Sequence, residues 1–193
     1  MIHTQHLYLR LMEKEDMALY CRSFPEPETG PLGTDPALAR AVEDALRNGL
    51  VHEDSLDMLI FLEETGELCG KLCLQRRDTE APELGIHMVP ACRGCGYGPE
   101  AIRSFTAWYA QTFGVNTFTV RIDPDNAHSR HVFRKLGAKY HGRIPKLSKE
   151  ELDTFRAALP EADLTPLEAL KADLFTLSAD RPIVGRQMGA DGV

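Results

Sequence analysis

The 193-residue sequence contains no apolar run near the ~20 residues that are needed to cross a bilayer. Its first six residues also lack the basic region and apolar core of a secretory signal. Basic residues are fewer than acidic ones: the sequence has 22 Lys and Arg and 29 Asp and Glu, which gives a formal net charge of -7. We therefore expect a cytoplasmic protein that binds neither membrane nor nucleic acid, whose binding domains usually carry a basic face. The acidic surplus favours a cationic substrate such as an amine.

Cysteine is sparse, with five residues in the chain. Four of them, Cys69, Cys73, Cys92 and Cys95, superficially resemble a four-thiolate zinc site, which would make the chain a zinc-held binding protein. Cys69 and Cys73 lie in a strand-like run, however, and a spacing of four places both on one strand face, too far apart for easy joint ligation. We expect small core or loop residues and no metal.

The length and an ordinary composition, 43% hydrophobic and 26% charged, indicate one soluble domain over residues 1–193 without repeats or linkers. Periodicity, proline and glycine predict an α+β arrangement around a mixed sheet. The expected strands are 5–11, 56–63, 67–75, 84–89, 117–123, 139–144 and 173–178, with a hairpin turn at 64–66. The expected helices are 13–21, 35–50, one that follows residue 98, 127–136, and two pieces of a polar insert at 146–172. Residues 185–193 read as a frayed tail.

The most informative stretch runs from Val89 to Glu100, because it reads as strand, glycine-rich turn and helix. Gly94, Gly96 and Gly98 permit backbone conformations and close approaches that a Cβ would block. Pro99 fits the first helical position. Unpaired amides and the positive end of the helix dipole form a seat for phosphate oxygens. The stretch lacks the Gly-Lys-Ser/Thr ending of a nucleoside-triphosphate loop and the spacing of a dinucleotide-binding loop.

The pattern Arg93-x-x-Gly96-x-Gly98 resembles the acetyl-CoA pyrophosphate loop of the GCN5-related N-acetyltransferase (GNAT) superfamily. Two further stretches are similar to the ribosomal-protein N-terminal acetyltransferase branch: residues 83–90, with an acidic residue before an apolar run, and residues 126–137, with the pattern Asn-x-x-Ser and then Lys-x-Gly. The resemblance implies a mostly antiparallel mixed sheet flanked by helices and splayed at the cofactor-binding strands.

The resemblance also implies how acetyl-CoA is held, with no metal involved. Backbone groups near Met88 and Val89 would bind the pantetheine arm in the gap between two strands. The following loop would bind the diphosphate, chiefly through main-chain N–H groups. Its residues are Arg93, Gly94, Cys95, Gly96, Tyr97 and Gly98. Asn126 contacts the cofactor in this family, or else it caps its helix, and both are compatible.

Acetyl transfer to an amine needs a base, because a primary amine has an unperturbed pKa near ~10.4. Glu83 is the first candidate, against the alternative of a solvent-exposed residue at a strand edge; His87, on the same strand face, is the second. Many family members protonate the CoA thiolate with a Tyr whose position is Phe133 here. Ser129 resembles the residue with this role in the ribosomal-protein branch, against the alternative of a plain helix-start hydroxyl.

These observations predict an acetyl-CoA-dependent N-acetyltransferase that acts by direct transfer in a ternary complex. The acceptor is a primary amine of a protein N-terminus, a lysine or a small molecule. The sequence carries no motif that distinguishes among these three acceptors. The 146–172 insert could narrow the site or form a homodimer contact. The alternative is a non-catalytic CoA-binding or sensing module on the same fold, since the usual acid is missing at Phe133.

Overall fold

The structure is a computed structural model that describes residues 1–24, 55–161 and 163–179. Within these ranges, eight strands form one sheet in the order β1-β2-β3-β4-β5-β6-β8-β7. All neighbouring strands are antiparallel except β5 and β6, which run parallel. The strands are β1 (Ile2–His3), β2 (Leu7–Leu11), β3 (Leu56–Leu62), β4 (Leu68–Gln75), β5 (Glu83–Met88), β6 (Thr117–Ile122), β7 (Lys139–Pro145) and β8 (Lys171–Ser178). The expected mixed, mostly antiparallel sheet is thus confirmed.

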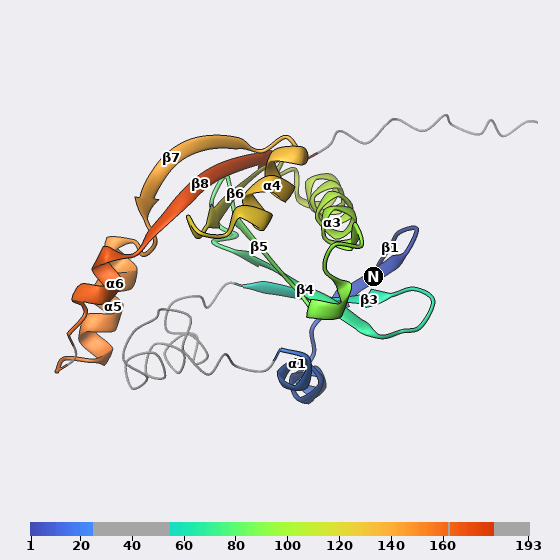
Figure 1. Ribbon diagram of the computed structural model, residues 1–193, viewed down its shortest axis with the longest axis horizontal. Helices are drawn as coiled ribbons and strands as arrows, with labels where there is room; N and C mark the ends of the chain where they lie inside the picture. The colour runs from blue at the N-terminus through green and yellow to red at the C-terminus, as the bar shows by residue number, and fades with distance from the viewer. Residues whose placement is uncertain (25–54, 162, 180–193) are drawn as a thin grey trace, which may run out of the picture.

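Helices lie on both faces of this sheet (Figure 1). The helical elements are η1 (Lys14–Asp16), α1 (Met17–Ser23), η2 (Pro90–Cys92), α3 (Tyr97–Phe113), α4 (Ala127–Lys135), α5 (Lys149–Ala158) and α6 (Thr165–Ala169). The main core lies under α3, where Ile102 and Phe105 pack against Leu7, Ile60 and other sheet residues. A smaller core joins α1 to the other face. None of the helices in the described ranges is long and apolar enough to span a membrane.

Most expected elements appear within a few residues of their predicted bounds. The hairpin is confirmed, since β3 and β4 pair antiparallel across a turn where Gly66 has a φ of +70°. Two expectations differ at their edges: α3 begins at Tyr97 rather than Pro99, and β8 begins at Lys171, two residues earlier than expected. The two-residue β1 is too short to give a periodic signal. The expected helix at 35–50 and the tail at 185–193 lie outside the described residues.

The prediction that Cys69 and Cys73 share a strand face is wrong. The pairing of β4 with β3 shifts between Gly70 and Leu68, so Cys69 is the extra residue of a β-bulge. Cys69 therefore packs in the main core under α3, whereas Cys73 lies beside Lys71 on the opposite face. Within the described residues, no group of His, Cys, Asp or Glu is arranged to hold a metal ion.

An ion pair between the partly exposed Arg10 and the buried Asp16 fixes the path from β2 into α1. Both oxygens of Asp16 accept hydrogen bonds of 2.6 Å from the Arg10 guanidinium, and Asp16 also accepts one of 2.8 Å from the main-chain N–H of Glu13. The Arg10 hydrogen bonds, followed by that from Glu13, lower the pKa of Asp16 from 3.8 to about 2. The charged form of Asp16 is therefore part of the folded structure.

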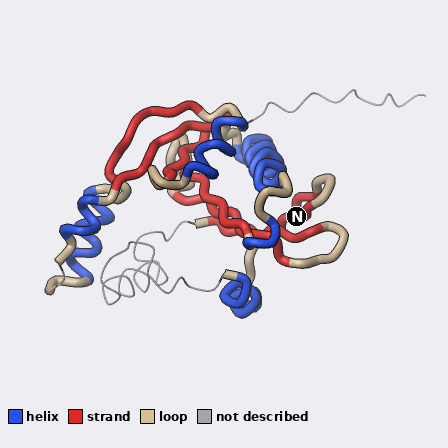
Figure 2. The backbone as a smooth tube through the Cα atoms, in the orientation of Figure 1, coloured by secondary structure: helices blue, strands red, loops and turns tan. Residues whose placement is uncertain are grey.

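The insert forms its own small core at one end of the sheet. Phe155, Leu164 and Leu167 are buried there between α5 and α6, which lie beyond the end of the β7–β8 hairpin (Figures 1 and 2). A capping box starts α5: Ser148 accepts a hydrogen bond from the N–H of Glu151, and Glu151 accepts one from the N–H of Ser148. This capped end of α5 faces the sheet where β5 and β6 meet.

Candidate active site at the β5–β6 gap

The parallel strands β5 and β6 are joined at a single residue pair. Glu83 pairs with Thr119, and the Thr119 N–H donates a hydrogen bond of 2.9 Å to the Pro82 carbonyl. Beyond this pair toward Met88, β5 has no ladder partner on its β6 side in the described part of the chain. The two strands therefore diverge and leave the gap that was expected between the cofactor-binding strands.

The backbone groups that face this gap follow from strand alternation. The Val89 N–H donates to the Cys69 carbonyl on the β4 side at 2.9 Å, so the N–H groups of Ile86 and Met88 point toward β6. The Met88 carbonyl accepts a hydrogen bond of 3.1 Å from Nε of Arg93. The Val89 N–H is therefore engaged with β4, whereas the N–H groups of Ile86 and Met88 have no acceptor among the described residues, and the role of the backbone near Met88 and Val89 in binding the pantetheine arm stays a prediction.

The glycine-rich turn lies at the open end of the gap. Gly94 and Gly96 have φ values of +78° and +86°, which favour glycine, and Gly96 is the N-cap of α3. The main-chain N–H groups of residues 94 to 98 have no hydrogen-bond acceptor within the described residues, whereas that of Arg93 donates to Pro90 at 3.2 Å. Gly94, Cys95 and Gly96 are exposed. Five free amides at a helix N-terminus form an anion-binding surface.

Glu100 fixes the position of this turn. Its carboxylate accepts hydrogen bonds from the Thr4 hydroxyl at 2.5 Å and from the N–H and Nδ1 of His6 at 2.8 and 2.9 Å. Burial opposes the charged form, but these hydrogen bonds outweigh it and lower the pKa of Glu100. The first turn of α3 is therefore tied to the segment between β1 and β2.

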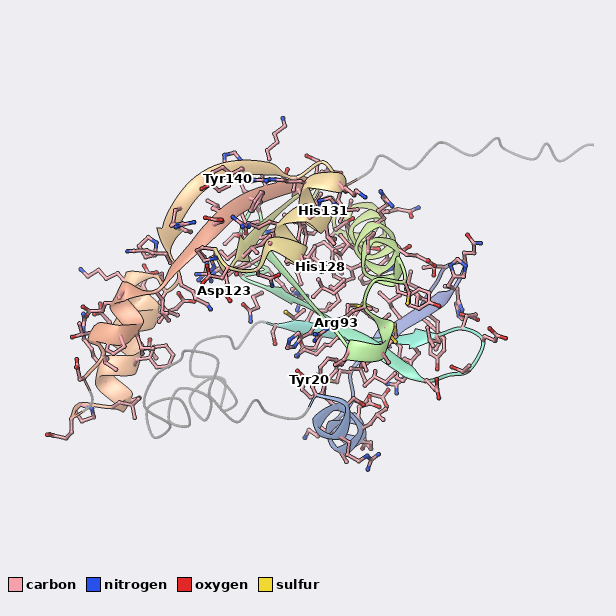
Figure 3. All side chains as sticks on the ribbon, in the orientation of Figure 1. Tyr20, Arg93, Asp123, His128, His131 and Tyr140 are labelled. Atoms are coloured by element: carbon pink, nitrogen blue, oxygen red, sulfur yellow. The ribbon has the colours of Figure 1, made fainter. Side chains whose placement is uncertain are left out.

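Across the gap, the start of α4 places Asn126 and Ser129 together. Oδ1 of Asn126 accepts a hydrogen bond of 2.9 Å from the Ser129 N–H, so Asn126 caps the helix as expected. The half-buried Ser129 hydroxyl has no partner within the described residues. Phe133 is 2% exposed and packs in the main core. Figure 3 shows His128 and His131 along α4, and Arg93 on the turn that leaves β5.

Glu83 stands at the closed end of the gap and has charged partners that the sequence did not indicate. Its Oε2 accepts hydrogen bonds from Nε of Arg121 at 2.8 Å and from Arg76 at 3.2 Å, and lies 2.7 Å from Nη2 of Arg121. Its Oε1 accepts one bond, also from Nε of Arg121, at 2.8 Å. Glu83 is thus a half-buried, ion-paired residue rather than the solvent-exposed strand edge of the alternative, and Oε1 keeps capacity to accept a further hydrogen bond.

The ion pairs continue from Glu83 into the insert. Nη2 of Arg76 donates to Oε1 of Glu151 at 2.7 Å, and Arg121 lies 3.6 Å from the same oxygen. Nη1 of Arg121 also donates to the Lys146 carbonyl at 2.5 Å. Burial of Glu151 opposes its charged form, but the Ser148 N–H and the two guanidinium groups lower its pKa. We did not predict these roles, although the Ser148-x-x-Glu151 capping-box pattern was visible in the sequence.

A cavity of about 330 Å³ opens beside this network, on the sheet face opposite α3. The lining side chains come from the closed end of the gap, from β7 and β8, and from the start of α5. They are Arg76, Glu83, Thr119, Arg121, Ile144, Pro145, Leu147, Ser148, Lys149 and Leu174. The closed end of the gap therefore adjoins a space of a size suited to a small substrate group.

His87, the second candidate base, lies on the same face of β5 as Glu83 but nearer the open end. Its ring stacks on Phe24 at a centroid distance of 5.3 Å. Partial burial, followed by the positive charges of Arg93 and Lys71, lowers the pKa of His87 below 6.5. The imidazole is therefore neutral near pH 7 and able to accept a proton.

The comparisons with known proteins agree with this architecture. The family model of an acetyltransferase (GNAT) domain matches residues 6–139. A curated relative, the uncharacterized N-acetyltransferase p20 of Bacillus licheniformis, is 23% identical over 155 residues, which are 77% of this chain and 87% of that protein. The chain belongs to the GNAT family of acetyltransferases, and the family implied by the glycine loop and the Asn helix is confirmed.

Solved structures show the same fold at low sequence identity. The ribosomal-protein-S5-alanine acetyltransferase of Vibrio fischeri matches with a TM-score of 0.60 at 14% identity, over 92% of this chain and 96% of that one. The spermidine/spermine N-acetyltransferase SpeG of Vibrio cholerae matches with a TM-score of 0.58 at 11% identity, over 90% and 92%. The chain is therefore an acyltransferase of the GNAT type, built on a fold that serves different acceptors.

Proposed function

We propose that the protein is an acetyl-CoA-dependent N-acetyltransferase that transfers the acetyl group directly to a primary amine. The observation that carries this proposal is a set of five amides, residues 94 to 98, that have no acceptor in the described part of the chain and lie at the mouth of a gap between two diverging strands. These amides fit a diphosphate, which needs several N–H donors in one small concave surface. A Cβ at Gly94 or Gly96 would force a strained backbone there.

The gap beside the amides fits the pantetheine arm. The N–H groups of Ile86 and Met88 have no partner among the residues that the structure describes, so an extended arm could pair with them as an added strand does. Asn126 and Ser129 would contact the cofactor from α4, in addition to the capping bond between them. Bound acetyl-CoA supplies an activated thioester, and a free strand N–H at the gap can stabilise the oxyanion that forms on its carbonyl.

The acceptor amine loses a proton to a group at the closed end of the gap. We propose Glu83, acting through Oε1 directly or through one water molecule, because it lines the cavity and Arg121 holds its orientation. Two neighbouring guanidinium groups also disfavour an ammonium ion and thus favour the neutral, nucleophilic amine. His87 is the second candidate base. Ser129 is the proposed proton donor to the thiolate, since buried Phe133 has no proton to give.

Thiol release from acetyl-CoA across a panel of amines and peptides tests the activity. We expect Glu83→Gln to lower kcat about 100-fold, the lower range for a lost general base, with little change in CoA affinity. His87→Gln is the matched comparison on the same strand face, and the pH dependence of kcat for both variants assigns the base. Unchanged kinetics in Glu83→Gln would remove Glu83 from the mechanism.

A second function stays open because Phe133 leaves the usual acid position without a proton. A non-catalytic CoA-binding or sensing module would keep the amides and the gap. It would bind acetyl-CoA in calorimetry and release no thiol with any amine of the panel. That pair of results would replace the enzyme proposal.

A further inference from the structure

The cavity at the closed end of the gap is cationic although the chain as a whole is acidic. Three of its lining side chains, Arg76, Arg121 and Lys149, are basic, and one, Glu83, is acidic. Glu151 pairs with both arginines from behind the lining, so the cavity carries a formal charge of +1, that is three cations minus two carboxylates, whereas the chain carries -7. A local charge opposite in sign to the net charge indicates what the cavity binds more directly than the composition does.

Arg76 has hydrogen-bonding capacity to spare. A guanidinium has five N–H donors, and those of Arg76 make two hydrogen bonds, one to Glu83 and one to Glu151, within the described residues. Its side chain is 36% exposed, and it lines the cavity. Arg76 is also the one non-glycine residue with positive φ in the described ranges, at +53°. From this turn the side chain reaches Glu83 and Glu151 at the cavity.

The start of α5 adds to the positive potential. Ser148 and Lys149, at the N-terminal end of this ten-residue helix, line the cavity. The capping box satisfies the N–H groups of Ser148 and Glu151 but leaves those of Lys149 and Glu150 without an acceptor in the described residues. The helix dipole places partial positive charge at this end. Two arginines, a lysine and a helix terminus thus converge on one cavity with apolar walls from Ile144 and Leu174.

On the basis of the proposed function, we infer that the acceptor is an amine that also carries a carboxylate, an amino-acid-like molecule or short peptide, and not a polyamine. The carboxylate binds Arg76 and the start of α5, the apolar part contacts the cavity wall, and the amine faces Glu83 and the gap. The second ammonium group of a diamine would meet the cationic lining without a free carboxylate to pair with. This reverses the preference for a cationic acceptor that the composition suggested.

The test uses three amines of equal length that differ in the group opposite the amine. These are 4-aminobutyrate, butylamine and 1,4-diaminobutane, with the corresponding six-carbon set to cover a different reach. We expect kcat/KM to fall in that order, by about tenfold or more from the amino acid to the diamine, as for loss of one charge-assisted contact. Equal or faster turnover of the diamine would overturn the inference and leave the N-acetyltransferase proposal standing.

Lys149→Glu removes one cation of the cavity and adds an anion without touching Glu83. We expect this variant to lower the ratio of kcat/KM for 4-aminobutyrate over 1,4-diaminobutane about tenfold or more, with an unchanged unfolding temperature. Lys135→Glu, an exposed change of the same charge on α4, is the control and should leave the ratio unchanged. Equal effects of the two variants would mean that net charge sets the preference, and would overturn the inference.

Binding measured without turnover separates the two proposals. Ligand-observed NMR with 4-aminobutyrate, in the presence of CoA, reports occupancy of the cavity in the wild type and in Lys149→Glu. One possible outcome is that the wild type binds 4-aminobutyrate, that Lys149→Glu does not, and that the wild type acetylates no amine of the panel. This outcome would support the anion site and refute the enzyme function. If the wild type neither binds nor acetylates 4-aminobutyrate or its six-carbon counterpart, the inference is overturned.

Discussion

Replacing Gly96 by Ala tests whether the backbone of the glycine turn, rather than its side chains, holds the cofactor. Gly96 has φ +86° and ψ -7°, and a Cβ built on it meets no atom within 4 Å. The substitution therefore adds no clash, and its effect comes from the left-handed backbone alone. For an L-residue, that conformation costs roughly 1–2 kcal/mol.

The same strain determines how much CoA binding should suffer. If the loop relieves it by leaving the binding geometry, the competent population falls by the corresponding factor. A cost of 1–2 kcal/mol corresponds to about 5- to 30-fold weaker CoA binding, because each 1.4 kcal/mol is tenfold in Kd. Isothermal titration calorimetry of CoA measures this change, with the unfolding temperature recorded alongside.

The other end of α3 supplies a matched control. Gly114 has φ +76° and ψ 3°, and its Cβ would also meet nothing within 4 Å. Gly114→Ala should therefore destabilise the fold about as much as Gly96→Ala does, while CoA affinity stays at the wild-type value. Unchanged CoA binding in Gly96→Ala, or an equal loss in Gly114→Ala, would refute the placement of the diphosphate on the turn.

Two further predictions concern stability. Asp16→Asn should lower the free energy of unfolding by about 1–2 kcal/mol at pH 7. This figure follows from the shift of the Asp16 pKa from 3.8 to about 2, reduced because its partner Arg10 is partly exposed to solvent. Because the folded pKa is the lower one, the wild-type advantage is present above pH 3.8 and is lost as the pH falls toward 2, which urea unfolding at several pH values measures. Gly85→Ala places a Cβ 2.6 Å from Sγ of Cys73, so we expect the free energy of unfolding to fall by about 1–3 kcal/mol. Adding Cys73→Ala should recover most of that stability. A persistent loss in the double variant would show that the clash is not its cause.

The local elements of the site could be predicted from the sequence because their signals are short-range. Strand, glycine turn and helix follow from the Val89 to Glu100 pattern, and the Asn126 cap follows from its position before a helical period. The exact start of α3 was missed because Pro99 is also tolerated within the first turn, where its missing N–H costs nothing. The resemblance to the GNAT family then supplied the mostly antiparallel mixed sheet and its splay at the cofactor-binding strands.

The partners of Glu83 could not be predicted in the same way. Arg76 lies seven residues before Glu83 and Arg121 lies 38 residues after it, and only the sheet brings them together. Nor does alternation along β4 predict a bulge, so the faces of Cys69 and Cys73 were assigned from a regular strand that the structure does not have. The direction of the Val89 amide likewise depends on the register of β4 and β5, which no single strand encodes.

The single pair that joins β5 to β6 has a consequence for the mechanics of the sheet. A single residue pair connects the part of the sheet made of β1 to β5 with the part made of β6, β8 and β7. The hydrogen bonds of the sheet therefore do not fix the twist of one part relative to the other. A cofactor arm in the gap would supply hydrogen bonds that β5 and β6 do not make to each other, and it would thereby stabilise the sheet. Amide exchange at Ile86 and Met88 should then slow on CoA binding, and the acceptor cavity would reach its final shape only in the loaded protein.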